Sequence, residues 1–143
     1  TENMWAWDKE ADRASFAICA TDESFCSLID EVGDDFMVAC LDIGHAEMMG
    51  ELASAEELVR SLGKRLAALH IHDCDRWHDS HQIPFSMNID FERVVKALKD
   101  ISYEGYLTLE ASSYLKDYRE DNVFDGVCDL YKSVKRLADM FDL

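Results

Sequence analysis

Histidines and aspartates crowd into one short stretch of the chain, LHIHDCDRWHDSH at residues 69–81. Four of the five histidines of the chain lie there, beside three aspartates. Imidazole nitrogens and carboxylate oxygens together suit divalent cations such as Zn²⁺, Mn²⁺ and Co²⁺. The stretch therefore predicts either a divalent-metal site or a polar loop that happens to be rich in histidine.

The elements that must position these side chains follow from the hydrophobic pattern. Apolar runs of strand length are found at residues 36–42, 65–73 and 105–111. Helical patterns lie at 21–32, 54–64, 90–101 and 123–141, and the first three begin at the expected capping residues Thr21, Ser54 and Asp90. The last helix has an apolar stripe of Val127, Leu130, Tyr131, Val134, Leu137 and Met140. Strands separated by helices pair in parallel through right-handed crossovers, so the sequence predicts an α/β fold.

Each of the three expected strands ends with a side chain that can bind a metal. Asp42 ends the first strand and Glu110 ends the third. His70 and His72 share one face of the second strand, so alternation of side chains leaves both as candidates. The carboxyl ends of parallel strands meet at one edge of the sheet, where such folds place their active sites. The mixed oxygen and nitrogen ligands predict a site for Mn²⁺, Co²⁺, Zn²⁺ or Mg²⁺.

The composition narrows the class of protein. The chain of 143 residues carries a formal net charge of −16, which disfavours a nucleic-acid partner because such proteins need a basic surface. It contains no apolar run long enough to span a membrane and no signal segment, so no membrane association is expected. The five cysteines form no CxxC pair, which is typical of a reducing compartment. These features predict a cytoplasmic protein.

Six short motifs resemble one known family and occur in its order along nearly the whole chain. They are TENMW at 1–5, LDIGH at 41–45, HIHDCDR at 70–76, DSH at 79–81, IDF at 89–91 and ISYEGYLTLEA at 101–111. The chain is therefore similar to the xylose isomerase-like TIM-barrel superfamily, which includes sugar-phosphate isomerases and epimerases, ketose 3-epimerases and endonuclease IV. The resemblance implies that residues 1–143 form the C-terminal half of a (β/α)8 barrel, about strands five to eight, without an internal boundary.

The resemblance also implies a role for individual residues. One divalent metal ion is expected on Glu2, Asp42, His70 and Glu110, with Glu2 and Glu110 also acting as the catalytic proton-transfer groups. Substrate binding is expected from His45 and Arg76. A possible additional metal or site residue is implied at Asp79 and at His81, and the two remaining histidines, His72 and His78, are expected to be bystanders.

The chain departs from the family pattern in two ways. Phe85 and Met87 stand where the family has glycines after HQIP, so the substrate loop is expected to differ in shape. The first four strands of the barrel have no counterpart in the sequence. A half-barrel exposes strand edges and apolar surface, which predicts a homo-oligomer or association with the missing N-terminal half.

The leading functional prediction is a divalent-metal-dependent sugar or sugar-phosphate isomerase or epimerase that acts by proton transfer through an enediolate. Its partner is then a small sugar or sugar phosphate. One alternative is an endonuclease IV-like metal phosphodiesterase, which the net charge of −16 and the short spacer between Asp73 and Asp79 both disfavour. The other alternative is a catalytically inactive barrel fragment.

Overall fold

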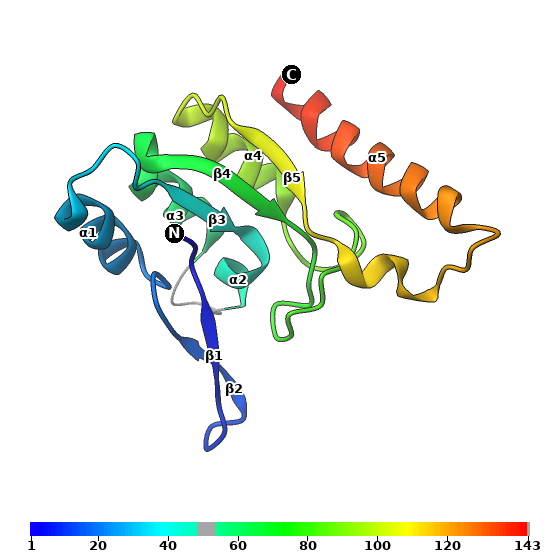
Figure 1. Ribbon diagram of the computed structural model, residues 1–143, viewed down its shortest axis with the longest axis horizontal. Helices are drawn as coiled ribbons and strands as arrows, with labels where there is room; N and C mark the ends of the chain where they lie inside the picture. Colours follow the sequence, from blue (N-terminus) through cyan, green and yellow to red (C-terminus); the bar gives the residue numbers. More distant parts are fainter. Residues whose placement is uncertain (49–53, 143) are drawn as a thin grey trace.

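The fold is built around a three-stranded parallel sheet. The computed structural model describes residues 1–48 and 54–142. The strands β3 (Ala39–Asp42), β4 (Leu66–Ile71) and β5 (Tyr106–Leu109) pair in the order β3-β4-β5. Glu2 adds an isolated parallel bridge to Cys40 at the outer edge of β3. The α/β prediction with parallel strands is confirmed, and the described residues form part of a barrel (Figure 1).

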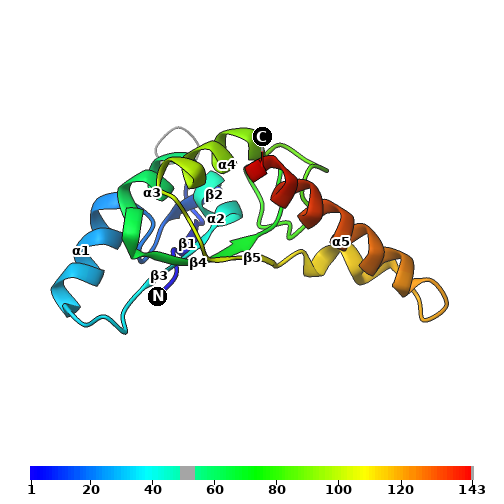
Figure 2. The ribbon, with the colours of Figure 1, turned by 90° about the horizontal axis from the view of Figure 1, so that it is seen from above.

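Helices cover one face of this sheet. After β3 come α2 (Ile43–Glu47) and α3 (Ala55–Leu62), and α4 (Phe91–Asp100) connects β4 to β5. Their apolar sides pack on strand residues that are almost fully buried, including Leu41, Leu69 and Ile71. Figure 2 shows α3 and α4 on the same side of the sheet. The helix α1 (Asp22–Val32) lies before β3 and packs against α3.

The predicted helix starts are confirmed by their caps. The Thr21 side chain accepts a hydrogen bond from the Ser24 amide, and the Ser54 hydroxyl accepts one from the Glu57 amide. Asp90 accepts from the amides of the second and third residues that follow it. Each cap satisfies amides that have no partner inside the helix, which is why these short polar residues fix where the helices begin.

The first strand is shorter than predicted. It begins at Ala39, and Phe36 is 96% exposed instead of lying in the strand. The Asp34 side chain accepts a hydrogen bond from the Phe36 amide, and the Asp34 carbonyl accepts one from Met37. Asp34 therefore holds residues 34–37 in a turn, and this local hydrogen bonding prevails over the apolar pattern.

The opposite face of the sheet is uncovered in the part of the chain that the structure describes. Tyr106 is 85% exposed on it, and Thr108 is exposed as well. Parallel sheets are normally covered on both faces, so this surface is unusual for the fold class. It is the same face that carries His70 and Glu110, the candidate metal ligands of β4 and β5.

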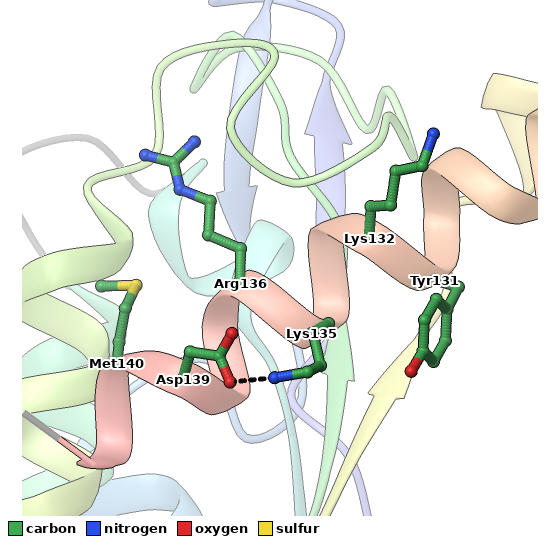
Figure 3. Close-up of a pocket in the computed structure, with 6 residues that line it drawn as sticks. All are labelled: Tyr131, Lys132, Lys135, Arg136, Asp139 and Met140. Atoms are coloured by element: carbon green, nitrogen blue, oxygen red, sulfur yellow. Dashed lines mark hydrogen bonds and ion pairs between the residues drawn. The ribbon is translucent and has the colours of Figure 1, made fainter.

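The last helix, α5 (Val123–Asp139), buries only part of its predicted apolar stripe. Leu137 is buried, but Val127 is 46% and Tyr131 is 65% exposed. A pocket on this helix is lined by Tyr131, Lys132, Lys135, Arg136, Asp139 and Met140, with an ion pair between Lys135 and Asp139 (Figure 3). The apolar stripe is therefore covered only in part by the described residues.

A two-stranded hairpin, β1 (Trp5–Asp8) paired antiparallel with β2 (Arg13–Phe16), was not predicted from the sequence. It projects away from the main sheet (Figure 1). Its strands have only four residues each, too few for an apolar pattern to stand out. Among the described helices, none is long and apolar enough to cross a membrane.

Candidate metal centre

Four predicted ligands come together at the carboxyl edge of the sheet. One ligand atom from each of Glu2, Asp42, His70 and Glu110 lies within 4.8 Å of the others. His70 Nδ1 is 3.2 Å from Glu2 Oε1 and 2.9 Å from Glu110 Oε2. We call these four residues the strand-end quartet. They meet because parallel strands carry their carboxyl ends to a common edge, as the spacing in the sequence indicates.

Asn3 fixes the position of Glu2 beside Asp42. Its side-chain oxygen accepts a hydrogen bond of 2.7 Å from the Asp42 amide, and its side-chain nitrogen donates one of 2.9 Å to the Asp42 carbonyl. Asn3 is only 1% exposed, so these bonds are shielded from water. The side chain thus replaces the backbone pairing that a neighbouring strand would supply to β3. No motif in the sequence indicates this role of Asn3, because its partner lies 39 residues away.

Replacing Asn3 with alanine is expected to lower the free energy of unfolding by about 2 kcal/mol or more, because two buried backbone groups lose their partners. Urea denaturation would measure this change. Asn88→Ala is a matched control, since Asn88 is exposed and donates one long hydrogen bond of 3.3 Å to Asp75. Equal effects of the two substitutions would contradict the role given to Asn3.

Two oxygens of the strand-end quartet are buried without a hydrogen bond. Asp42 Oδ1 accepts from the His45 amide and contacts His72 Nε2 at 3.1 Å. Asp42 Oδ2 and Glu110 Oε2, in contrast, have no hydrogen-bond partner among the described residues. The contact of Glu110 Oε2 with His70 is short but lacks hydrogen-bond geometry. Unpaired buried carboxylate oxygens are costly, and a divalent cation would compensate them, so the donor set fits a metal ion.

A second group lies beside the first. Here too, one ligand atom from each of four residues lies within 4.8 Å of the others. These residues are His45, His72, Asp79 and His81, and we call them the histidine cluster. Asp79 Oδ1 is buried without a hydrogen bond in the described chain, 3.1 Å from His81 Nε2. The rings of His72 and His81 stack with centroids 4.2 Å apart. His72, expected to be a bystander, is a fully buried member of this cluster, and its Nε2 lies 3.1 Å from Asp42 Oδ1 of the strand-end quartet.

His45 connects the two groups electrostatically. Its Nδ1 is 3.7 Å from Glu2 Oε1, and its Nε2 is 3.5 Å from Asp79 Oδ2. Burial by itself lowers the pKa of His45, but the hydrogen bond and charge of Asp79, the charge of Asp42 and the Asn3 carbonyl together raise it to about 9. Burial likewise raises the pKa of Asp79, yet the neighbouring histidines, led by His45, bring it down to about 2. In the metal-free chain His45 is therefore protonated at neutral pH.

The free energy of unfolding of the metal-free chain is expected to fall as the pH rises. Because the pKa of His45 increases on folding from 6.5 to about 9, its ionic stabilisation is complete below pH 6.5 and is lost as the pH passes through 9. Between these values the expected slope is about 1 kcal/mol per pH unit. Urea unfolding in chelator at several pH values measures it. Asp79→Asn should flatten the dependence, and an unchanged slope in that variant would contradict the pairing.

Arg76 does not join either group. Its Nε lies 3.4 Å from Glu47 Oε2, and Glu47 also accepts a hydrogen bond from the Ala55 amide. Arg76 has a left-handed backbone with φ of 72°, and its side chain is 43% exposed. The described structure shows no ion pair from Arg76 to the strand-end quartet or the histidine cluster. The predicted substrate arginine is thus held near α2.

Ring contacts compensate for backbone strain in the loop where the sequence departs from the family pattern. Phe85 stands where a glycine was expected, and it adopts the left-handed φ of 71° that favours glycine. Its ring packs on Phe91 with centroids 5.1 Å apart, and the Arg136 guanidinium lies 3.7 Å above it. These contacts offset the backbone strain of about 1 kcal/mol. A bulky residue therefore occupies a left-handed position in this loop, and the expected difference in the shape of the loop stays a prediction.

Comparison with known proteins agrees with this architecture. The family model described as "Xylose isomerase-like TIM barrel" matches residues 1–133. A D-tagatose 3-epimerase-like protein superposes with a TM-score of 0.69 and 23% identity, over 99% of this chain and 46% of the other. A D-allulose 3-epimerase from Methylomonas sp. gives a TM-score of 0.67 and 23% identity, over 86% and 43%. Protein MJ1311 of Methanocaldococcus jannaschii, itself uncharacterised, is 28% identical over 70% of this chain and 37% of its own length.

The chain spans less than half the length of these proteins. The match to the family model nevertheless covers most of its residues, in agreement with the resemblance of its sequence motifs. This chain belongs to the xylose isomerase-like TIM-barrel family.

Proposed function

We propose that this chain carries the metal site of a divalent-metal-dependent sugar or sugar-phosphate isomerase or epimerase. The observation that carries the proposal is the strand-end quartet, in which buried oxygens of Asp42 and Glu110 lack hydrogen-bond partners. The solved relatives that superpose on it are sugar epimerases, which supports the same class of reaction. Mn²⁺, Co²⁺, Mg²⁺ and Zn²⁺ all accept these ligands.

Glu2, Asp42, His70 and Glu110 would hold the cation. When bound, the cation would supply positive charge that stabilises an enediolate of an α-hydroxy carbonyl sugar. Glu2 and Glu110 approach His70 Nδ1 with one oxygen each, at 3.2 and 2.9 Å, which leaves a second oxygen on each carboxylate. One of these carboxylates removes the proton beside the sugar carbonyl, and the other returns a proton to the neighbouring position or to the opposite face.

His45 and Arg76 are proposed to orient the sugar. The His45 ring is anchored through Nδ1, 3.1 Å from the Asn3 carbonyl, which directs Nε2 toward Asp79 Oδ2, 3.5 Å away. From there His45 would donate a hydrogen bond to a substrate oxygen. Glu47 positions Arg76, whose exposed guanidinium would bind a distal hydroxyl or phosphate group.

Hydrogen exchange at the substrate carbon tests the proposal directly. In D₂O, the Mn²⁺-loaded chain is expected to exchange the proton beside the carbonyl in at least one member of a panel of ketoses and ketose phosphates, followed by proton NMR. Asp42→Asn and Glu110→Gln should abolish the exchange, whereas Asp117→Asn, on an exposed residue, should not. Exchange that survives in the first two variants, or that is absent with the cation bound, would contradict the proposal.

A second candidate function is favoured by the histidine cluster. With its unpaired Asp79 oxygen, this group has the ligands for an additional cation, namely His45, His72, Asp79 and His81. A site with several metal ions would suit an endonuclease IV-like phosphodiesterase. The net charge of −16 opposes DNA binding and ranks this candidate second. Cleavage of a duplex with an abasic site by the metal-loaded chain would reverse the ranking.

The uncovered sheet face is proposed to be a contact surface for more polypeptide. Exposed side chains lie near the edge of β5 that has no partner among the described strands. They are Tyr106 and Thr108 on β5, and Val127 and Tyr131 on α5. A further strand paired with that edge would satisfy its backbone groups, and the polypeptide that carries the strand would cover the exposed side chains. We propose that a second copy of the chain, or the N-terminal half of a barrel, occupies it. Light scattering tests this: a stable, well-behaved monomer of the chain alone would contradict the proposal.

A further inference from the structure

Aromatic rings lie beyond the metal centre on the same two segments that supply its residues. The segment that begins with Glu2 continues to Trp7 on β1, and the loop that supplies Asp79 places His78 just before it. The rings of Trp7 and His78 stack, with centroids 6.5 Å apart and planes inclined by 21°. Trp5 meets the edge of Trp7 at 6.5 Å. We call the Trp7 and His78 pair the aromatic shelf.

The orientation of His78 is set within its own loop. Asp75 Oδ1 accepts hydrogen bonds from the Trp77 and His78 amides, at 2.8 and 2.7 Å. Asp75 Oδ2 lies 2.7 Å from His78 Nδ1, which fixes the plane of the imidazole. Arg76, with its left-handed backbone, completes this tight turn. The His78 ring therefore needs no contact with Trp7 to hold its orientation, and the shelf is preorganised.

The rings of the shelf are accessible to solvent. Trp7 is 40% exposed and the His78 side chain is 70% exposed. Trp5 lies on the same face of the hairpin but packs against the core, so it suffices to anchor the hairpin. Trp7 thus presents apolar ring surface close to a polar metal centre. Sites of this kind bind sugars by stacking an aromatic ring on the apolar face of the sugar ring.

We propose that the aromatic shelf binds a second ring of the substrate, which makes the substrate class a disaccharide or other glycoside. This inference rests on the proposed function, because the strand-end quartet defines where the reacting sugar lies. Trp7 lies five residues beyond Glu2, on the hairpin that projects away from the main sheet (Figure 1), so the shelf lies to one side of the reacting sugar. His78, next to Asp79, brings the inner end of the shelf close to the histidine cluster. On this proposal a ring linked to the reacting sugar stacks on the shelf.

The test compares D-fructose with lactulose, in which the same ketose carries a galactose ring. Calorimetric titration of the Mn²⁺-loaded chain is expected to give an affinity for lactulose about three- to tenfold higher than that for fructose. Trp7→Ala should remove this difference and leave fructose binding unchanged. Trp77→Ala is the matched control, since Trp77 lies in the same loop, is 66% exposed and, among the described residues, makes no ring contact with the shelf.

The outcomes separate this inference from the proposed function. Equal affinities for the two sugars in the unmodified chain would overturn the proposal that the shelf binds a second ring, and would leave the proposed metal chemistry intact. Loss of both affinities together in Trp7→Ala, with the bound Mn²⁺ retained, would assign Trp7 to holding the hairpin and would also overturn it. His78→Ala provides a second variant, expected to reduce the preference for lactulose without disturbing β1. Failure of the proposed function is read separately, from the absence of hydrogen exchange at the ketose.

Discussion

Substitution of Glu110 by glutamine is expected to weaken Mn²⁺ or Co²⁺ binding by about a hundredfold or more. Loss of a residue that only supports a ligand already costs about ten- to a hundredfold, and Glu110 is proposed to contact the ion itself. The substitution removes the negative charge but keeps the size of the side chain, so the fold is retained. Turnover should be abolished together with metal binding. Calorimetric titration of the chelator-treated chain measures the affinity.

Glu104→Gln is the matched control for that experiment. Glu104 precedes the same strand, carries the same charge and is exposed. Its replacement should leave the affinity unchanged, because distant surface charges are screened by salt. A decrease of less than about tenfold in Glu110→Gln, or an equal decrease in both variants, would remove Glu110 from the ligand set.

Replacing Gly44 with alanine is expected to lower the free energy of unfolding by about 2 kcal/mol. A Cβ at this position would lie 2.7 Å from His72 Nδ1 and closer still to Cε1 and Nε2. His72 is fully buried and contacts Asp42 through Nε2, so the ring has no free space into which it can move. Displacing it also disturbs Asp42, and metal affinity should fall as well. Thermal or urea denaturation measures the stability.

The expected loss of stability is opposite to the usual effect, because replacing glycine by alanine within a helix normally stabilises the helix by about 1 kcal/mol. Gly126 in α5 offers the comparison. A Cβ there would lie 2.8 Å from Leu115 Cδ2, the end of a flexible side chain that can turn aside, and 3.0 Å from two ring atoms of Tyr118, which need to shift by only a few tenths of an ångström. Gly126→Ala should therefore cost much less than Gly44→Ala. Equal stability of the Gly44→Ala variant and the unmodified chain would show that His72 is not confined as described.

Periodicity alone predicted two members of the strand-end quartet, Asp42 and Glu110, whereas Glu2 and the choice of His70 were implied by the family resemblance. Asp42 and Glu110 each follow an apolar run, and parallel strands bring such positions to one edge. The choice between His70 and His72 could not be made from alternation, because the two share a face. In the structure both are used: His70 Nδ1 faces Glu2 and Glu110, while His72 contacts Asp42.

The features that were missed depend on contacts between distant segments. Asn3 bonds Asp42 across 39 residues, and nothing in its neighbours indicates that pairing. The close approach of Gly44 to His72 is equally invisible in the sequence. For α5 the periodicity identified the apolar stripe, but it could not show whether a partner covers Val127 and Tyr131. Whether such a stripe is buried depends on the rest of the assembly.

The central claim is that the strand-end quartet holds one divalent cation. Anomalous diffraction from crystals of the chain grown with Mn²⁺ tests it most directly, because the signal locates the ion among named ligand atoms. We expect one strong peak between the carboxylates of Glu2, Asp42 and Glu110 and His70 Nδ1, absent in Glu110→Gln. No peak, or a peak only within the histidine cluster, would contradict the claim.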